Sequence, residues 1–264
     1  VHQWYCGMQD AGGVLQKGPW VGNRFHWYCL FDNEDYRITK GVKHRFQYDS
    51  QVKNGRGYYY PGTPEYKLMA TGKNMDDVKV QEPVAPFNDG LTYTNSISSN
   101  CLAFTTKYAD VTDPTIGRTD AYWPFLRYAD IVLIYAEAQC ELNDGISQDA
   151  IDALNDIRIR SNAKEASVTG DGAIETKVEL RSVIFEERAK ELAYEGDRRW
   201  DLLRWGIYLD VMNSLGGINE DGTRTPYDEG SINKRREFRH LLYPLPSLEV
   251  STNMAIDKNN PGWN

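Results

Sequence analysis

The sequence predicts a mainly α fold in which a loop-rich segment precedes a series of helices. Residues 1–120 are crowded with turn signals, such as paired glycines and Asp-Pro, which allow short strands like residues 44–48 but no long helices. In residues 121–264, apolar side chains recur with the period of an α-helix. Eleven of the 24 tryptophans and tyrosines lie in residues 1–66, so the two regions also differ in composition. We therefore predict one domain of 264 residues with two parts, a loop-rich ligand-binding region and a helical scaffold.

The helical part is divided by turn residues. The first helix is predicted over residues 123–142, with Pro124 in its first turn. A second helix is predicted to begin at a cap formed by Ser147 or Asp149. A loop rich in serine, glycine and aspartate follows over residues 161–175.

Two more helices and a terminal strap complete the prediction. The third helix is expected over residues 176–194, where Gly196 breaks it, and the fourth over residues 198–209. A loop over residues 213–240 then leads to an extended apolar strap at residues 241–246. Helices joined by short loops pack as hairpins, so this half of the chain predicts tetratricopeptide-like helix hairpins. No repeat of about 34 residues accompanies them.

Composition excludes several classes of protein. The formal net charge of −8 argues against binding to nucleic acid or to an anionic membrane surface. No apolar run approaches the roughly 20 residues of a membrane-spanning helix. The cysteines show no CxxC spacing and only four histidines are present, so no metal site is predicted. The four cysteines are Cys6, Cys29, Cys101 and Cys140.

The densest charge pattern lies in the third helix. Glu187, Glu191 and Glu195 are four residues apart and fall on one helical stripe. Such a stripe could bind a metal or perform acid–base catalysis, but no histidine accompanies it and arginines are present in matching number. We therefore favour ion pairs between helices. The candidate partners are Arg127, Arg158, Arg160, Arg198 and Arg204.

Other motifs of known chemistry are weak or absent. Residues 217–222 place oxygen-bearing side chains at alternate positions, as calcium loops do, but their first position is glycine, so a solvated loop is favoured. Neither a phosphate-binding GxxxxGK[ST] loop nor a GxSxG elbow occurs. We predict no cofactor.

Aromatic residues near the start of the chain are the candidate ligand-binding residues. A sugar ring presents C–H groups that flat aromatic faces can cover, while polar side chains bind its hydroxyls. Alternatively, these rings only fill a loop-rich core. Trp20 and Trp27 are the first candidates. The full set is Trp4, Tyr5, Trp20, Trp27 and Tyr28.

Motifs of the helical part resemble a known family. Residues 127–138 (RYADIVLIYAEA) and 153–160 (ALNDIRIR) are similar to two of its helices, and residues 187–205 (ERAKELAYEGDRRWDLLRW) to its most specific segment. Further similarities follow the same order at residues 31–37 (FDNEDYR), 243–246 (YPLP) and 260–263 (NPGW). Together they resemble the SusD/RagB family.

The resemblance implies both a function and a location. SusD-like proteins are non-enzymatic lipoproteins exposed on the outer membrane of Bacteroidetes-type bacteria. They bind oligosaccharides, or peptides in the RagB branch, and deliver them to a SusC-like TonB-dependent transporter. Family members are about twice as long and carry a lipidated cysteine in an N-terminal half, which this chain is expected to lack. Cys6 is not expected to be that anchor. The resemblance also implies that the arginines and glutamates of the motifs are scaffold.

Three alternatives remain open. The same fold could bind peptides, which an aromatic-poor cleft would favour. A glycoside hydrolase would need two carboxyl groups facing a groove, and Glu187, Glu191 and Asp201 are the candidates. A purely structural adaptor would bind no ligand.

Overall fold

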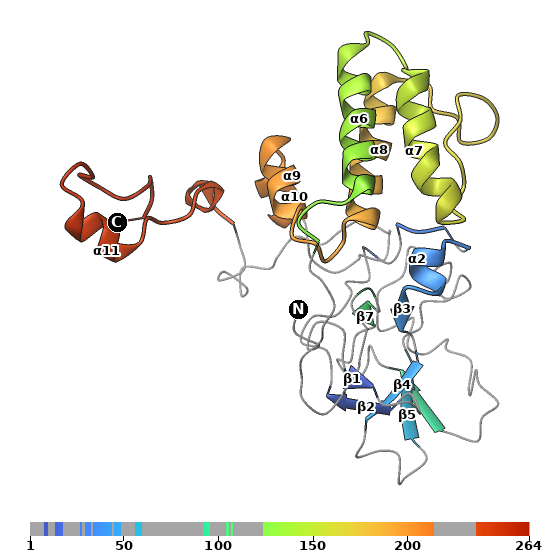
Figure 1. Cartoon of the computed structure of the whole chain (residues 1–264), viewed down its shortest axis with the longest axis horizontal. Helices are drawn as coiled ribbons and strands as arrows, with labels where there is room; N and C mark the ends of the chain where they lie inside the picture. Colours follow the sequence, from blue (N-terminus) through green and yellow to red (C-terminus); the bar gives the residue numbers. More distant parts are fainter. Residues whose placement is uncertain are drawn as a thin grey trace. The chain divides into compact units, whose positions relative to one another are not determined.

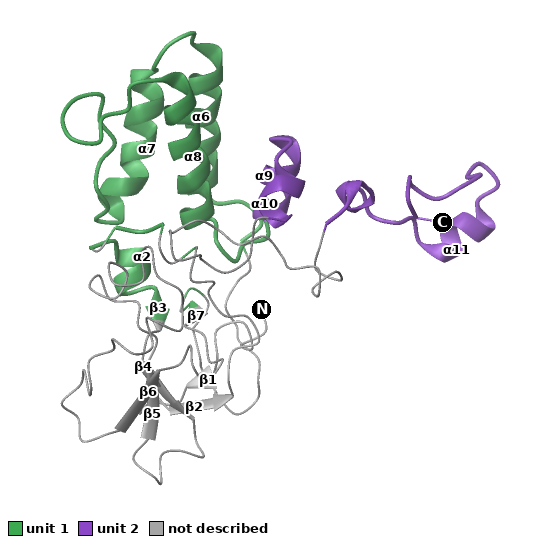
Figure 2. Ribbon diagram, turned by 180° about the vertical axis from the view of Figure 1, so that it is seen from behind, with its two compact units in different colours: residues 1–69, 79–196 green, residues 70–78, 197–264 purple. Residues whose placement is uncertain are grey.

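In the computed structural model of the protein, the chain folds into two compact units. Unit 1 comprises residues 1–69 and 79–196, and unit 2 comprises residues 70–78 and 197–264 (Figure 2). The predicted division at residue 120 stays a prediction. The residues that the structure describes are 8–9, 14–17, 27, 30–32, 34–43, 45–48, 56–59, 92–95, 104–105, 107, 124–213 and 236–263.

Three helices lie side by side in unit 1, which is consistent with the predicted mainly α fold (Figure 1). They are α6 (Tyr128–Leu142), α7 (Gln148–Arg160) and α8 (Lys177–Glu191). Helices α6 and α7 form a hairpin through a short connection. The 161–175 loop then leads from the end of α7 back to the start of α8. Lys177, at the start of α8, donates to backbone oxygens at the end of α6. Helix α8 therefore runs antiparallel to α6 and in the same direction as α7.

The helix boundaries correct two predictions. Pro124 does not lie in the first turn of α6, because Arg127 is still extended (φ −119°, ψ 154°) and the helix starts at the next residue. Helix α8 ends at Glu191 and is followed by Tyr194 at φ 67°, so the predicted helix up to residue 194 is too long. Glu195 therefore lies in a turn beyond α8 and not on its helical stripe.

Side-chain caps fix where α7 and α8 begin. The Ser147 hydroxyl accepts a hydrogen bond from the Ala150 N–H, which confirms one of the two predicted caps. At α8, the Thr176 hydroxyl accepts from the Glu179 N–H, and the Glu179 carboxylate accepts from the Thr176 N–H. This capping box satisfies two backbone donors that the helix leaves without partners.

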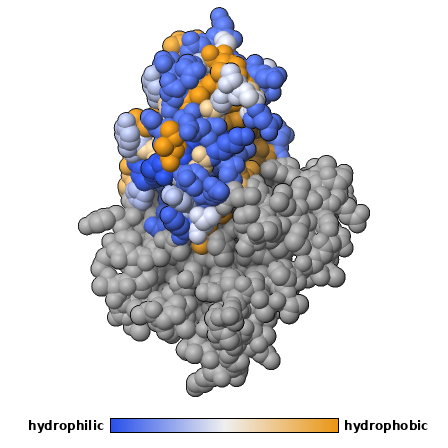
Figure 3. Space-filling view, turned by 90° about the vertical axis from the view of Figure 1, so that its right-hand side faces the viewer, coloured by the Kyte–Doolittle hydropathy of each residue, from blue (hydrophilic) through white to orange (hydrophobic). Residues whose placement is uncertain are grey.

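The core of unit 1 is apolar and lies between the three helices. Leu133, Leu154, Leu180 and Ile184 are fully buried there. Cys140 is a free cysteine buried in the same cluster. On the described part of one face, Figure 3 shows hydrophobic patches between hydrophilic side chains, and several large apolar side chains of α6, such as Tyr128 and Leu142, are exposed.

In the rest of unit 1, the elements among the described residues are short strands and the short helix α2 (Tyr36–Thr39). Strands β1 (Met8–Gln9), β2 (Val14–Lys17), β4 (Arg45–Tyr48), β5 (Arg56–Tyr59) and β6 (Thr92–Asn95) form a sheet in the order β1-β2-β4-β5-β6. Strand β4 confirms the strand predicted at residues 44–48. Strands β3 (Val42–Lys43) and β7 (Phe104–Thr105) form an antiparallel pair.

A single-turn helix, α2 (Tyr36–Thr39), connects this part to the helices. The Tyr36 N–H donates to the Ser161 carbonyl at 2.8 Å, and the Lys164 N–H donates to the Asp32 carboxylate at 3.0 Å. The segment that contains α2 is therefore hydrogen-bonded to residues 161–164, which follow α7.

In unit 2, the predicted fourth helix is two helices. Helix α9 (Arg198–Arg204) and helix α10 (Tyr208–Asn213) are separated by Gly206 at φ 75°. Glycine adopts this left-handed conformation at little cost, so it ends the first helix before the second begins.

The YPLP motif (residues 243–246) and the NPGW motif (residues 260–263) lie against each other. The predicted extended strap is confirmed only in part, because the 3₁₀ helix η3 (Phe238–Leu241) precedes it and α11 (Ser247–Thr252) follows it. The Asn260 side chain donates to the Tyr243 carbonyl, and the Trp263 indole donates to the Arg239 carbonyl. Gly262 has φ 82°, and a Cβ there would stand 2.6 Å from the Arg239 Cβ. Only glycine fits this close approach.

Within the described parts of the chain, no helix has the length and apolar character needed to cross a membrane.

Candidate functional site

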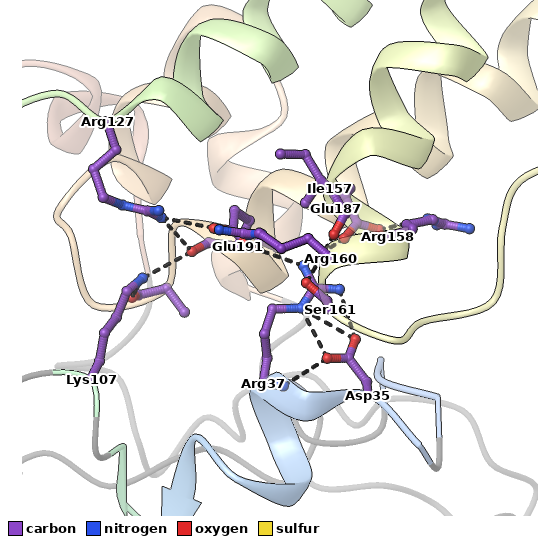
Figure 4. Close-up of polar contacts among 12 residues, drawn as sticks. Asp35, Arg37, Lys107, Arg127, Ile157, Arg158, Arg160, Ser161, Glu187 and Glu191 are labelled. Atoms are coloured by element: carbon purple, nitrogen blue, oxygen red, sulfur yellow. Dashed lines mark hydrogen bonds and ion pairs between the residues drawn. The ribbon is translucent and has the colours of Figure 1, made fainter.

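Three glutamates from the end of α8 and the turn beyond it are buried in unit 1. Glu187 is 0% exposed, Glu191 5% and Glu195 8%. Cationic side chains from distant parts of the chain converge on them, as Figure 4 shows for Glu187 and Glu191. We call this set the ion-pair layer. It comprises Asp35, Arg37, Lys107, Arg127, Arg158, Arg160, Glu187, Glu191 and Glu195.

Glu187 is held by two arginines. Its Oε1 accepts from Arg37 Nη1 at 2.6 Å, and its Oε2 accepts from Arg158 Nε at 2.8 Å. Arg158 belongs to the last turn of α7, whereas Arg37 belongs to α2. One buried carboxylate therefore links α2, α7 and α8.

Glu191 is contacted by three arginines. Arg160 Nη2 lies 2.7 Å and Arg127 Nη2 3.1 Å from its Oε1, and Arg37 Nη1 lies 3.2 Å from its Oε2. Burial alone would raise the pKa of Glu191, but the hydrogen bond from Arg160 and the charges of the three arginines outweigh burial. The pKa of Glu191 is consequently lowered from its ordinary value, and the carboxylate is ionised at neutral pH.

Glu195 pairs with Lys107 and with Arg127, whose Nε and Nη2 both donate to its carboxylate at 2.7 Å. The Lys107 ammonium also donates to the backbone carbonyls of Glu191 and Ala193. Burial lowers the pKa of Lys107, and the attraction of Glu195 offsets only part of this effect. Lys107 thereby binds the backbone that follows α8.

Asp35 fixes the position of Arg37 within the layer. The Asp35 carboxylate caps α2 by accepting from the Arg37 N–H at 2.8 Å, and it also binds the guanidinium through Nη2 at 2.7 Å. Because Asp35 binds both the backbone N–H and the guanidinium of Arg37, it orients the arginine side chain toward Glu187.

The sequence pattern predicted six of the nine residues of this layer. The contacts support the predicted ion pairs of Arg127, Arg158 and Arg160 with the three glutamates. Arg204 instead pairs with Asp201 at 3.0 Å in unit 2, and Arg198 stacks on Trp205. Arg37 and Lys107 were not predicted as partners, although residues 31–37 were noted as a motif.

A cavity of about 390 Å³ opens beside the ion-pair layer. This volume lies within the range typical of small-molecule sites, about 300–1,000 Å³. Among the described residues of its lining, three are aromatic and five are cationic. We call it the Trp27 cavity, and its lining is Trp27, Tyr36, Arg37, Gly41, Thr105, Lys107, Arg127, Arg160, Ser161, Lys190, Glu191, Ala193 and Tyr194.

Trp27, a predicted ligand-binding residue, is half-buried in the wall of this cavity. Its indole N–H donates to the Ala189 carbonyl at 2.8 Å. Its ring meets Phe31 and Tyr194 edge to face, with centroids 4.7 and 6.0 Å apart. The ring is therefore held in place, and its role in binding stays a prediction. The other predicted residues, Trp4, Tyr5, Trp20 and Tyr28, lie outside the described residues.

The structure does not favour the hydrolase alternative. Its candidate carboxylates, Glu187, Glu191 and Asp201, are at most 5% exposed and each is paired with arginine. In the described part of the chain, no group of three potential metal-ligating side chains is arranged to bind a metal. The candidate calcium loop at residues 217–222 lies outside the described residues.

Comparison with curated proteins gives relatives from one organism, Formosa agariphila. The chain is 33% identical to SusD-like protein P2 over 142 residues, which are 52% of this chain and 25% of P2. It is 36% identical to SusD-like protein P38 over the same length, again 25% of that protein. The matched segment thus spans about a quarter of these relatives.

Solved structures share the fold. A SusD homologue from Bacteroides thetaiotaomicron has a TM-score of 0.57 at 22% identity, over 87% of this chain and 41% of that one. A SusD superfamily protein from Parabacteroides distasonis has a TM-score of 0.55 at 18% identity, over 99% of this chain and 47% of that one. The sequence profile of the SusD family matches residues 22–263. The chain belongs to the SusD family.

Proposed function

We propose that this protein binds oligosaccharide at the outer-membrane surface and delivers it to a SusC-like TonB-dependent transporter, without catalysis. The observation that carries the binding proposal is the Trp27 cavity, where three aromatic side chains lie beside charged hydrogen-bonding groups in a chain of the SusD family.

The cavity supplies both kinds of contact that sugars use. The rings of Trp27, Tyr36 and Tyr194 offer surface to the C–H face of a sugar. The guanidinium and ammonium groups of the wall donate hydrogen bonds that hydroxyl oxygens accept. Of the three rings, Tyr36 is the most exposed, at 43%, and carries the Lys40 ammonium 3.4 Å from its ring centroid.

Relatives support a sugar ligand. One solved structure with a TM-score of 0.53 at 18% identity is a laminarin-binding SusD-like protein. The aromatic wall also favours a sugar over the peptide of the alternative proposal, because extended peptides are bound mainly through backbone hydrogen bonds. Delivery to a transporter and the outer-membrane location are inferred from the SusD family.

The test is titration calorimetry of Tyr36→Ala and Trp27→Ala against oligosaccharides selected on a combined glycan and peptide array. Each ring is expected to contribute about 1–3 kcal/mol, so each variant should lose about fivefold or more in affinity. Tyr128→Ala is the matched control, because Tyr128 is 82% exposed on α6 and lies outside the cavity.

Tyr36→Ala is the cleaner variant, because the Trp27 indole also donates a hydrogen bond that the fold uses. Unchanged affinity in a folded Tyr36→Ala protein would remove the cavity as the binding site. Binding of peptides alone on the array would replace oligosaccharide with peptide as the ligand.

A further inference from the structure

Among the described residues, cationic side chains outnumber carboxylates in the wall of the Trp27 cavity. Glu191 is its one carboxylate among the described residues. The cationic side chains of the wall are Arg37, Lys107, Arg127, Arg160 and Lys190. A ligand in the cavity therefore meets mainly cationic side chains, which donate hydrogen bonds.

The other carboxylates that pair with these cations do not line the cavity. Asp35 and Glu187 are 0% exposed and Glu195 is 8% exposed, and none of the three lines the cavity. Lys190 pairs with Glu186, which is also outside the wall. Among the described residues, the five cations of the wall and Arg158, which shares Glu187 with Arg37, pair with five carboxylates, so the formal charge of this set is +1.

Arg160 is the cation best placed to meet a ligand. Its side chain is 54% exposed, whereas that of Arg37 is 15% and that of Lys190 5% exposed. Among the described residues it makes one ion pair, from Nη2 to Glu191 Oε1 at 2.7 Å. A guanidinium has five N–H donors in a planar fork, so most of its donors remain for an anion.

We propose that the Trp27 cavity binds an acidic sugar, one that carries a carboxylate or a sulfate ester, and that Arg160 contacts its anionic group. The inference rests on the proposed function, because it names the class of sugar for the same cavity. Arginine suits both anions, since its fork donates two parallel hydrogen bonds to paired oxygens. The aromatic side chains then contact the apolar face of the sugar ring.

The test compares three oligosaccharides of equal length, one uronate-containing, one sulfated and one neutral. Wild-type protein is expected to bind at least one acidic oligosaccharide about tenfold or more tightly than the neutral one, since a charged hydrogen bond contributes about 1.5–3 kcal/mol. Added salt is expected to weaken the acidic complex selectively, because the half-exposed arginine is screened.

Arg160→Gln should remove the preference for the acidic sugar, and should weaken neutral binding far less, because the glutamine amide can still donate a hydrogen bond to a hydroxyl. Arg160→Lys should restore part of the preference, because it restores the charge. Arg181→Gln is the matched control, since Arg181 pairs with Glu141 outside the cavity. The unfolding midpoint of each variant checks that the fold is kept.

The outcomes separate the two proposals. Equal binding of acidic and neutral sugars by wild-type protein, or a preference that survives in Arg160→Gln, overturns the acidic-sugar inference and leaves oligosaccharide binding intact. Binding of none of the three sugars overturns both. The uronate and sulfated probes tell the two sources of the anion apart.

Discussion

Unit 1 contains two buried regions of opposite chemistry. Between α6, α7 and α8 the packing is apolar, and Leu133, Leu154 and Leu180 are fully buried. At the end where α6 begins and α7 and α8 finish, the buried side chains are charged, as in the pair of Arg37 with Glu187. The apolar core joins neighbouring helices, whereas the ion-pair layer joins residues 150 positions apart.

The two regions contribute to the fold in different ways. Apolar burial stabilises the helices in proportion to the area removed from water and is not directional. Buried ion pairs contribute little net stability, because desolvation offsets the attraction, but each pair depends strongly on both partners. We infer that the core stabilises the helix bundle and that the ion-pair layer fixes where residues 31–43 attach to it.

The largest effect is expected from breaking the ion-pair layer at Glu187. Glu187→Gln removes the carboxylate that pairs with Arg158 and one of the three carboxylates that contact Arg37, which should lower the free energy of unfolding by about 3–5 kcal/mol. Urea unfolding measures it. Glu141→Gln is the control, because the Glu141 pair with Arg181 is about half exposed and should cost less than about 1 kcal/mol. Equal losses in both variants would contradict a special role for burial.

Truncating the apolar core comes next. Leu154→Ala removes a fully buried side chain at the centre of the helix cluster and should cost about 2–5 kcal/mol. Ile159→Ala, on the same helix but 60% exposed, is the matched control and should change little. If oligosaccharide binding in the residual folded protein were lost as well, the core and the cavity would not be separable as we describe.

Acid should weaken the ion-pair layer through Glu191. Its folded-state pKa is depressed, so its stabilising effect is present above the ordinary value of 4.5 and is lost as pH falls through the folded-state pKa. Glu191→Gln should therefore cost about 1.5–3 kcal/mol at neutral pH. The difference from wild type should shrink below pH 4.5. A pH-independent difference in unfolding free energy would contradict this assignment.

The smallest effect is expected at the start of α8. Thr176→Ala removes the hydroxyl of the capping box and should cost about 0.5–2 kcal/mol. Thr176→Ser keeps the acceptor and should retain most of the stability. Because this site touches neither the core nor the ion-pair layer, oligosaccharide affinity should be unchanged in both variants.

Local patterns predicted the apolar core well. The 3.6-residue period located α6, α7 and α8, and Ser147 marked the start of α7 as expected. The boundaries failed where a backbone conformation intervened, at Gly206 and at Tyr194, because periodicity reports which face is apolar and not where the chain leaves the helix.

The ion-pair layer was predictable only in part. Charge counting paired the glutamates with nearby arginines, but nothing local to Arg37 or Lys107 indicates a partner 150 or 88 residues away. The one available signal was the motif at residues 31–37, whose Asp35 cap orients Arg37. The cavity was likewise unpredictable beyond Trp27, since Tyr36, Arg160 and Tyr194 meet there only after folding.

A double-mutant cycle between Arg37 and Glu187 measures whether the ion-pair layer joins α2 to α8. Urea unfolding would be measured for wild type, Arg37→Met, Glu187→Gln and the double variant. Because the buried groups depend on each other, the double variant should lose at least about 0.5 kcal/mol less than the sum of the single losses. Losses that simply add would show that the two residues act independently, and would contradict an ion-pair layer that joins α2 to α8.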